Sequence, residues 1–383
     1  MIEAGIDEVT MILLPVSELL NSPDRRWYDI ANEMVFEAEE KLNLLDLFGE
    51  RKYMNKAISG YSVGYTYGHH NFFFTVCYHH IWARMGVLIK FSAQALAYYQ
   101  GQTNLMPYEI LQQMRSPLYQ VRCSRIDIAV DFIEEGIDIN EIYTGYLNEQ
   151  IKVFVIRERN GRIEHTEKSY KIQVICSEGD CETVYFGKRD SPVMLRIYNK
   201  KTEQINNRGS RYSEAVQYND WVRFELEAKH DYAHKLTTAL LDTKNDIEYK
   251  EIILDFIIQK YFFVTANNNA PAPFLQQLID MKNNQEITLF KSVNTKNTEL
   301  SKNLLHLLRT SGTVTTLYKI NAIWGNAGLK KCMDTITEII KTHQPNQDCV
   351  RFLRNNLEEY RIAYSDYDSF FESEILPELL ALP

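Results

Sequence analysis

Apolar and polar residues alternate in short runs through the first half of the chain, a pattern that predicts β-strands. The N-terminal run is IDEVTMILLP, and aromatic-rich runs follow at YSVGYTYG, NFFFTVCYHH and MGVLIKFS. Between these runs, apolar residues recur every three or four positions from Trp27 to Leu45, which predicts one amphipathic helix. Ser22 and Pro23 would supply its N-cap and a proline at the first helical position.

A second strand-rich region extends from about Leu118 to His230, and helical periodicity dominates beyond it. Its predicted strands are YQVRCSRIDIAVDF, IKVFVIRE, YKIQVIC, ETVYFG, MLRIYN and WVRFELEAK. The predicted fold class is α+β: a mostly antiparallel or mixed sheet with flanking helices, followed by a helical C-terminal domain. We expect three parts, an N-terminal α/β part at 1–115, the polar-faced sheet at 116–240 and the helical domain at 241–383.

Three of the predicted strands combine one apolar face with one polar face, because successive side chains of a strand point to opposite sides. In SRIDIAVDF the polar side chains are Arg125, Asp127 and Asp131. In MLRIYNK they are Arg196, Tyr198 and Lys200, and in WVRFELEAK they are Arg223, Glu225 and Glu227. Packed in one sheet, these faces would bring together carboxylates, arginines and one tyrosine.

Such a cluster has the groups needed for chemistry on a phosphate. Carboxylates hold hard divalent cations such as Mg²⁺ or Mn²⁺. A tyrosine can act as the nucleophile of a covalent intermediate, and arginine can bind the phosphate through two hydrogen bonds. Amphipathic antiparallel strands with a solvated charged face show the same pattern without any activity, so the residues alone leave both interpretations open.

Composition limits the class of protein. The 383 residues suggest two or three domains, and the net charge of −9 argues against indiscriminate binding of nucleic acid. The charge is uneven, however, because residues 186–214 carry seven Lys/Arg against three Asp/Glu. No run of 18 apolar residues predicts a membrane span, and the N-terminus lacks a basic signal-peptide region. Six scattered cysteines without a CxxC pair suggest reduced thiols and a cytoplasmic location.

The polar strands resemble, in order, the motifs of the Rep_trans family, which comprises replication initiators of rolling-circle plasmids and related relaxases of integrative conjugative elements. The matching segments are SRIDIAVDF, ETVYFGKRDSPVMLRIYNKKTEQ and WVRFELEAKHDYA, preceded by MGVLIKFSAQALAYY. The resemblance extends from about Tyr53 to Leu241, about half of the chain. It implies a replication initiator of a rolling-circle plasmid or mobile element that nicks and rejoins one DNA strand, sequence-specifically and with a metal.

The resemblance also implies roles for residues. Tyr198 would be the nucleophile that stays attached to the 5′ phosphate, and Asp127 and Glu225 would hold Mg²⁺ or Mn²⁺. Further candidate metal ligands are Asp131, Glu203 and Glu227, and the candidate DNA-binding residues of the core are Arg125, Arg189, Arg196, Lys200, Lys201 and Arg223. Many nicking enzymes use a His-x-His motif for the metal, whereas this chain has the adjacent pairs His69-His70 and His79-His80, whose members would point to opposite strand faces.

Two further segments are candidates for binding DNA. The run TVTTLYKINAIWGNAGLKKCMDTITEIIK resembles a helix-turn-helix around Asn326 to Gly328, with Lys330 and Lys331 meeting phosphates. An ordinary αα-hairpin that packs Leu317, Ile320, Ile323 and Ile336 explains the same pattern. The run IKVFVIRERNGRIEHTEKSYKIQ predicts two strands joined by a turn at Asn160-Gly161, and its six cations against three acids suit either a DNA backbone or an unliganded surface hairpin.

Other functions remain open from the sequence. A relaxase that nicks a transfer origin would share the same core, and a DNA-binding regulator without activity would share the fold. A metallohydrolase with a water nucleophile would use the acids without Tyr198. As partners we expect origin DNA, a helicase and a second copy of the chain in a homodimer, with no membrane. The acidic C-terminal tail could serve as a docking peptide for the helicase or simply be solvated.

Overall fold

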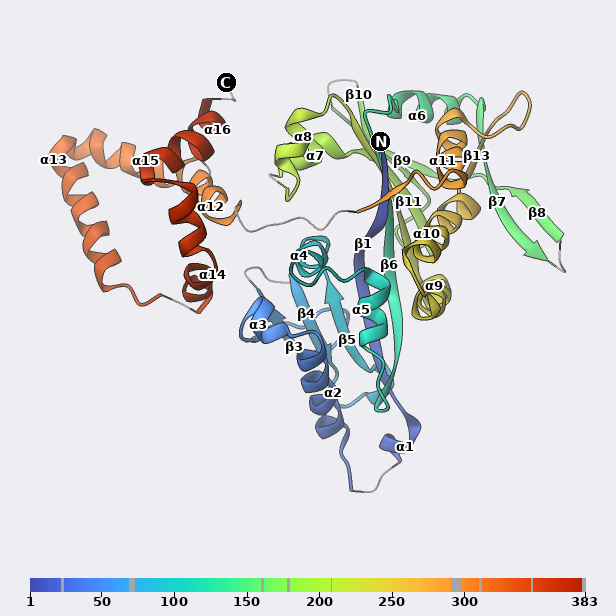
Figure 1. The fold of residues 1–383 in the computed structure, drawn as a ribbon, viewed down its shortest axis with the longest axis horizontal. Coiled ribbons are helices and arrows are strands. Elements are labelled where there is room, and N and C mark those ends of the chain that lie inside the picture. The colour runs from blue at the N-terminus through green and yellow to red at the C-terminus, as the bar shows by residue number, and fades with distance from the viewer. Residues whose placement is uncertain are drawn as a thin grey trace. The chain divides into compact units, whose positions relative to one another are not determined.

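The computed structural model describes residues 1–21, 24–68, 73–159, 162–177, 180–207, 209–290, 298–309, 312–345 and 347–380. The chain divides into two compact units, Met1–Val293 and Asn294–Pro383 (Figure 1). None of the described helices combines the length and apolar character needed to span a membrane.

The first unit is built on a large, mostly antiparallel sheet. Its strand order is β2-β3-β4-β5-β1-β6-β12-β11-β10-β9, and β14 pairs in parallel with β1. The strands are β1 (Ile2–Pro15), β2 (Lys52–Tyr53), β3 (Val63–Tyr67), β4 (Phe74–Tyr78), β5 (Val87–Phe91), β6 (Tyr119–Ile133), β9 (Ile172–Ser177), β10 (Asp180–Phe186), β11 (Val193–Asn199), β12 (Trp221–Lys229) and β14 (Thr288–Leu289). The long strands β1 and β6 pair along their whole length and therefore join the two halves of the sheet.

A smaller sheet has the order β13-β7-β8. It consists of β7 (Ile151–Arg159), β8 (Arg162–Glu167) and β13 (Phe262–Thr265). The antiparallel pairing of β7 with β8 confirms the two strands predicted for this segment. The predicted turn at Asn160-Gly161 lies outside the described residues.

The helices of the first unit lie between the strands along the chain. They are α1 (Ser17–Leu20), α2 (Trp27–Lys41), α3 (Leu44–Phe48), the 3-10 helix η1 (Ala83–Met85), α4 (Ala93–Thr103), α5 (Pro107–Gln113), α6 (Ile139–Leu147), α7 (Lys200–Asn206), α8 (Tyr212–Gln217), α9 (His230–Asp242), α10 (Asp246–Lys260) and α11 (Pro273–Asn283). The single helix predicted to run to Leu45 is wrong, because α2 ends at Lys41 and Asn43 adopts a left-handed conformation (φ 48°) before α3. The predicted helix start at Ser22 and Pro23 is also wrong, because α2 begins at Trp27 with Arg26 as its N-cap. Ser22 and Pro23 themselves lie outside the described residues.

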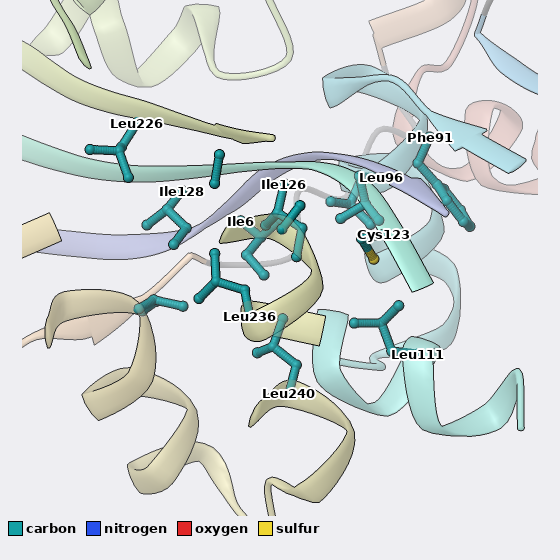
Figure 2. Packing of buried hydrophobic residues seen from close by; sticks show 14 of the residues in the cluster. Ile6, Phe91, Leu96, Leu111, Cys123, Ile126, Ile128, Leu226, Leu236 and Leu240 are labelled. Atoms are coloured by element: carbon teal, nitrogen blue, oxygen red, sulfur yellow. The ribbon is translucent and has the colours of Figure 1, made fainter. Parts of the chain in front are cut away.

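The apolar face of the sheet lies against helices. Ile6 of β1, Ile126 and Ile128 of β6 and Leu226 of β12 are buried in one cluster with Leu236 and Leu240 of α9 (Figure 2). Side chains alternate along a strand, so the residues between these apolar positions face the other side of the sheet. The polar faces of the central strands are therefore turned away from α9.

The C-terminal unit is helical, with α12 (Thr298–Arg309), α13 (Thr313–Thr342), α14 (Gln347–Ala363), α15 (Tyr367–Phe370), the π-helix η3 (Phe371–Ile375) and α16 (Leu376–Leu380). The sequence pattern placed the change to this domain at residue 241, whereas the first compact unit extends to Val293. The difference arises because buried side chains of α9, α10 and α11 join the core of the sheet.

Helix α13 covers the segment for which a helix-turn-helix or an αα-hairpin is predicted. The chain stays helical on both sides of Gly325, which has φ 63° and ψ −169° and kinks the helix. No residue of α13 is buried, so the predicted hairpin packing of Leu317, Ile320, Ile323 and Ile336 is wrong. Lys330 and Lys331 are exposed just beyond the kink.

Candidate active site

The polar faces of β6, β12 and β11 lie side by side, because these strands are consecutive in the sheet. Their register brings together the polar residues singled out above. The directly opposed pairs are Asp127 with Glu227, Asp131 with Arg223, Arg196 with Glu225 and Tyr198 with Arg223. One face of the sheet thus carries the tyrosine, the acids and the arginines together.

Tyr198 stands at the end of β11, directly before Asn199, whose side chain caps α7 by accepting from the Thr202 backbone N–H. Its Oη donates to Oε2 of Glu225 at 3.0 Å and accepts from Nζ of Lys200 at 3.3 Å. The guanidinium of Arg196 lies 4.2 Å from the centre of the ring. Only 5% of Tyr198 is exposed, so its side chain contacts neighbouring residues such as these three and almost no solvent.

The phenol of Tyr198 is held in its neutral form. Burial raises its pKa well above the ordinary value, and the charges of Glu225 and Asp7 add to this while Arg223 and Arg196 oppose it. The hydrogen bond to Glu225 directs the phenolic proton toward a carboxylate oxygen. An attack by Oη therefore requires that this proton leave, and Glu225 is the acceptor in contact with it.

Arg223 lies opposite Tyr198 on the neighbouring strand β12 and binds two carboxylates, Asp131 and Asp7. Its Nε and Nη2 donate to the two carboxylate oxygens of Asp131 at 2.5 Å and 2.7 Å, and its Nη1 donates to Asp7 at 2.6 Å. Burial alone would raise the pKa of Asp7, but the cations Arg223, Lys200 and Arg196 outweigh it and hold that pKa below its usual value. Both oxygens of Asp131 are thus committed to Arg223.

Asp7 is a residue of this face that the sequence analysis missed. The pairing of β1 with β6 shifts register between Ile6 and Glu8, which leaves Asp7 as the extra residue of a β-bulge. The bulge turns Asp7 to the polar face, while Glu8 pairs with Asp127. Two adjacent acids inside an otherwise apolar strand were the available signal, since a regular strand would place one of them in the core.

Asp127 lies in a group of carboxylates. Burial raises its pKa to about 8 against the opposing effect of Arg125, and the negative charges of Glu225 and Glu8 add to the rise. Arg125 donates to both oxygens of Asp127 at 2.8 Å and 2.5 Å, and Lys90 lies 3.0 Å from Glu8. Glu227 forms ion pairs with Arg125 and Lys229.

The acids suit a divalent cation in their chemistry, but not in their present spacing. Among the residues that the structure describes, no three His, Cys, Asp or Glu side chains are grouped as metal ligands. The carboxylate oxygens of Asp127, Glu225 and Glu8 are nevertheless the donors that Mg²⁺ and Mn²⁺ prefer. A cation between them would relieve the repulsion that contributes to the raised pKa of Asp127.

The other predicted residues are spread more widely. Glu203 lies one turn into α7 and pairs with Lys200 at 2.8 Å, whereas Lys201 donates to the Asn219 carbonyl at 3.3 Å. Arg189 is exposed in the turn before β11, at the opposite end of that strand from Tyr198. Lys330 and Lys331 belong to the C-terminal unit.

The histidine pairs contribute no ligands among the described residues. His79 accepts hydrogen bonds from the backbone N–H groups of Ile81 and Trp82 at 3.1 Å and 3.2 Å, and so stabilises a turn. His80 Nδ1 lies 2.6 Å from the hydroxyl of Ser62. His69-His70 lies outside the described residues.

Phe290 also reaches the polar face, from a segment distant in sequence. Its backbone N–H donates to the Ala4 carbonyl at 2.9 Å, directly after β14. A Cβ at Gly5 would lie 2.5 Å from the Phe290 ring, so only glycine leaves room there. The Arg223 guanidinium lies 5.0 Å from the centre of the ring, so Phe290 packs beside the Tyr198 network. No local sequence signal could have indicated this contact.

The chain belongs to the family described as Replication initiation factor (Rep_trans), whose model matches residues 121–332, more than half of the chain. The resemblance drawn from the strand motifs is therefore confirmed. A Replication initiation protein of Staphylococcus aureus is 28% identical over 150 residues, which cover 39% of this chain and 38% of that protein. The match thus spans well under half of that relative's length.

A solved structure shares the fold. The rolling circle replication initiator protein from Geobacillus stearothermophilus matches with a TM-score of 0.54 at 18% identity, over 76% of this chain and 100% of that chain. This likeness and the large antiparallel sheet confirm the predicted α+β class.

Proposed function

We propose that this protein starts rolling-circle replication of a plasmid or mobile element by cutting, and later rejoining, one DNA strand through Tyr198. The observation that carries the proposal is the Tyr198 hydroxyl, which donates to Glu225 while Arg196, Lys200 and Arg223 surround it. A neutral phenol with a proton acceptor on one side and cations on the others suits attack on a phosphodiester. Membership of the replication initiation factor family supports the same assignment.

The reaction would exchange one phosphodiester for another. Oη of Tyr198 attacks phosphorus as its proton passes to Oε2 of Glu225, the bond from phosphorus to the 3′ oxygen breaks, and that oxygen takes up a proton from water as it leaves. The 5′ phosphate remains on Tyr198 and the DNA keeps a free 3′ hydroxyl. Because the number of phosphodiester bonds is unchanged, the reverse attack by a 3′ hydroxyl rejoins the strand without an energy source.

The cations around the ring would receive the phosphate. Arg196 and Lys200 lie 4.2 Å and 5.5 Å from the ring centre of Tyr198, so they help to cover a side chain that is only 5% exposed. A phosphate that draws these two cations to itself would uncover the phenol at the same time. Arg223 would add positive charge from the neighbouring strand.

Asp127, Glu225 and Glu8 are the residues that would hold a divalent cation, through oxygens other than the one that accepts the phenolic proton. When bound, Mg²⁺ or Mn²⁺ supplies polarisation of a phosphoryl oxygen. The negative charges of Glu225 and Glu8, which act on Asp127, support this choice. A cation there would take the place of Arg125, which donates to both oxygens of Asp127.

The test is a denaturing gel of purified protein with Mn²⁺ and labelled single-stranded oligonucleotides from the element that encodes it. Tyr185→Phe is the matched control for Tyr198→Phe, because Tyr185 lies opposite Arg196 on the adjacent strand β10. We expect a labelled band at protein mass with wild type and Tyr185→Phe, lost with Tyr198→Phe and on adding EDTA. Cleavage by all three proteins without an adduct would mean that water is the nucleophile and would refute the proposal.

A further inference from the structure

Four cations from four different elements gather on the part of the first unit built from the small sheet and α9–α10. They are Arg157 on β7, Lys168 directly after β8, Lys235 on α9 and Lys260 at the end of α10. Lys260 experiences the positive charges of Arg157, Lys235 and Lys168. Because α9 covers the apolar face of the large sheet, this cationic cluster is separated from the Tyr198 network by the sheet itself.

Aromatic rings connect the members of the cluster. Nζ of Lys168 lies 4.6 Å from the ring centre of Tyr170, and the Tyr170 hydroxyl donates to the Lys260 carbonyl at 3.4 Å. Nζ of Lys260 lies 4.5 Å from the ring of Tyr232 and 5.4 Å from that of Phe256. The rings place the lysines close together on one surface.

The cluster has little compensating negative charge within the described residues, where Glu164 lies opposite Arg157 in the pairing of β7 with β8. None of its four cations lies within ion-pair distance of a described carboxylate, although many other cations of this unit form such pairs. Burial lowers the pKa of Lys168 and Lys260, and the neighbouring positive charges lower both further. Like charges held together without counter-charge are unfavourable for the protein alone and favour the binding of an anion.

We propose that this cationic cluster binds the phosphate backbone of duplex DNA on the side of the large sheet opposite the Tyr198 network. The proposal rests on the proposed function for its partner, DNA. The surface is open and its cations come from a strand, a loop and two helices, which suits several phosphates along a backbone rather than one small anion in a pocket. Strand β8 is exposed along its length and extends the surface beyond the cluster.

The experiment measures binding of full-length protein to a labelled duplex of arbitrary sequence over a range of salt concentrations. The test variant is Arg157→Gln/Lys168→Gln/Lys235→Gln, whose three positions are exposed. The control is Arg26→Gln/Lys56→Gln/Lys244→Gln, which removes the same charge from other exposed positions. Lys260 is left intact because it is half-buried.

We expect the test variant to weaken duplex binding roughly tenfold or more at about 0.1 M salt, and to reduce the slope of log K against log salt by about two to three. The control should stay close to wild type. Adduct formation on a short single-stranded oligonucleotide should be unchanged in both. Equal affinities and equal slopes for the test and control variants would overturn the inference.

Two further arms keep the outcome interpretable. Lys235→Glu, a single change at an exposed position of α9, should weaken duplex binding by itself if the triple variant fails to fold. A wild type that forms no adduct, together with a test variant that binds duplex less tightly, would refute the proposed nicking reaction and leave the DNA-binding surface standing.

Discussion

At the scale of single residues, the central feature is the contact of the Tyr198 hydroxyl with Glu225. The acceptor is itself held by Arg196, whose Nη2 lies 2.7 Å from each carboxylate oxygen. This fixes the carboxylate against the phenol, and the buried surroundings keep the phenol neutral until a proton can be transferred. In the proposed reaction, proton transfer from Tyr198 therefore depends on Glu225 more than on any other acid of the face.

Glu225→Gln should slow formation of the covalent adduct roughly 100-fold or more, because a glutamine cannot accept the phenolic proton. Glu227→Gln is the matched control, since Glu227 lies on the same face of β12 two residues away. Single-turnover rates on a single-stranded oligonucleotide give the comparison. Equal losses for the two variants would mean that Glu225 has no particular part in the reaction.

The buried pair of Arg223 and Asp131 gives a stability prediction. Arg223 is 4% exposed and Asp131 is fully buried, so Asp131→Ala leaves the buried guanidinium of Arg223 with Asp7 in place of two carboxylate partners. We expect a loss of about 3–5 kcal/mol in the free energy of unfolding. Asp242→Ala, which breaks an exposed ion pair with Arg115, should cost less than about 1 kcal/mol. Urea unfolding measures both, and similar midpoints would contradict the assignment of a buried network.

At the scale of elements, the bulge in β1 and the short strand β14 complete the polar face. The bulge turns Asp7 toward Arg223, and β14 brings Phe290 over Gly5. Both features depend on strand pairing rather than on the residues of one strand. They explain why a strand from the N-terminus and a segment near the end of the first unit take part in one site.

The contact of Gly5 with Phe290 can be tested by a double-mutant cycle. Gly5→Ala adds a Cβ that would lie 2.5 Å from the ring, and we expect it to destabilise the first unit by about 1–3 kcal/mol. In a Phe290→Ala background the same change should cost clearly less. Thermal unfolding of the wild type, the two single variants and the double variant gives the coupling. Strict additivity would contradict the packing of Phe290 on Gly5.

The sequence predicts the elements that depend on local alternation and misses those that depend on distant pairing. Period-two alternation placed Asp127, Tyr198 and Glu225 on polar faces, and the register of β6, β12 and β11 brings those faces together. The role of Arg223 as the partner of Asp131 and Asp7 was not predicted, because it requires three strands in register. The helical periodicity of the sequence likewise continues past Asn43. The helix itself ends at Lys41, because Asn43 adopts a left-handed backbone conformation.

At the scale of the whole molecule, the residues proposed for catalysis all belong to the first unit, Met1–Val293. The second unit has a small core around Leu305, Phe370 and Ile375, and its long helix α13 exposes Lys330 and Lys331. This division suits a strand-cutting unit joined to a unit that contributes to recognition of the origin.

A protein truncated after Phe290 should therefore form the adduct on a single-stranded oligonucleotide within a few-fold of the full-length rate. It should lose preference for origin duplex over unrelated duplex, because the helices of the second unit, which are expected to contribute to origin recognition, are absent. Lys330→Ala/Lys331→Ala in the full-length chain should weaken binding of both duplexes alike, because contacts with phosphates carry no sequence information. Competition binding with the two duplexes gives the measurement, and an unchanged preference in the truncated protein would place recognition in the first unit.

The most direct test of the central claim is the identity of the residue that carries DNA. Wild-type protein is allowed to react with the oligonucleotide and Mn²⁺, then digested, and the peptide bearing nucleotide is sequenced by mass spectrometry. We predict a nucleotide joined through its 5′ phosphate to Tyr198, the next-to-last residue of β11. Attachment to a different residue, or through a 3′ phosphate, would contradict the proposed chemistry.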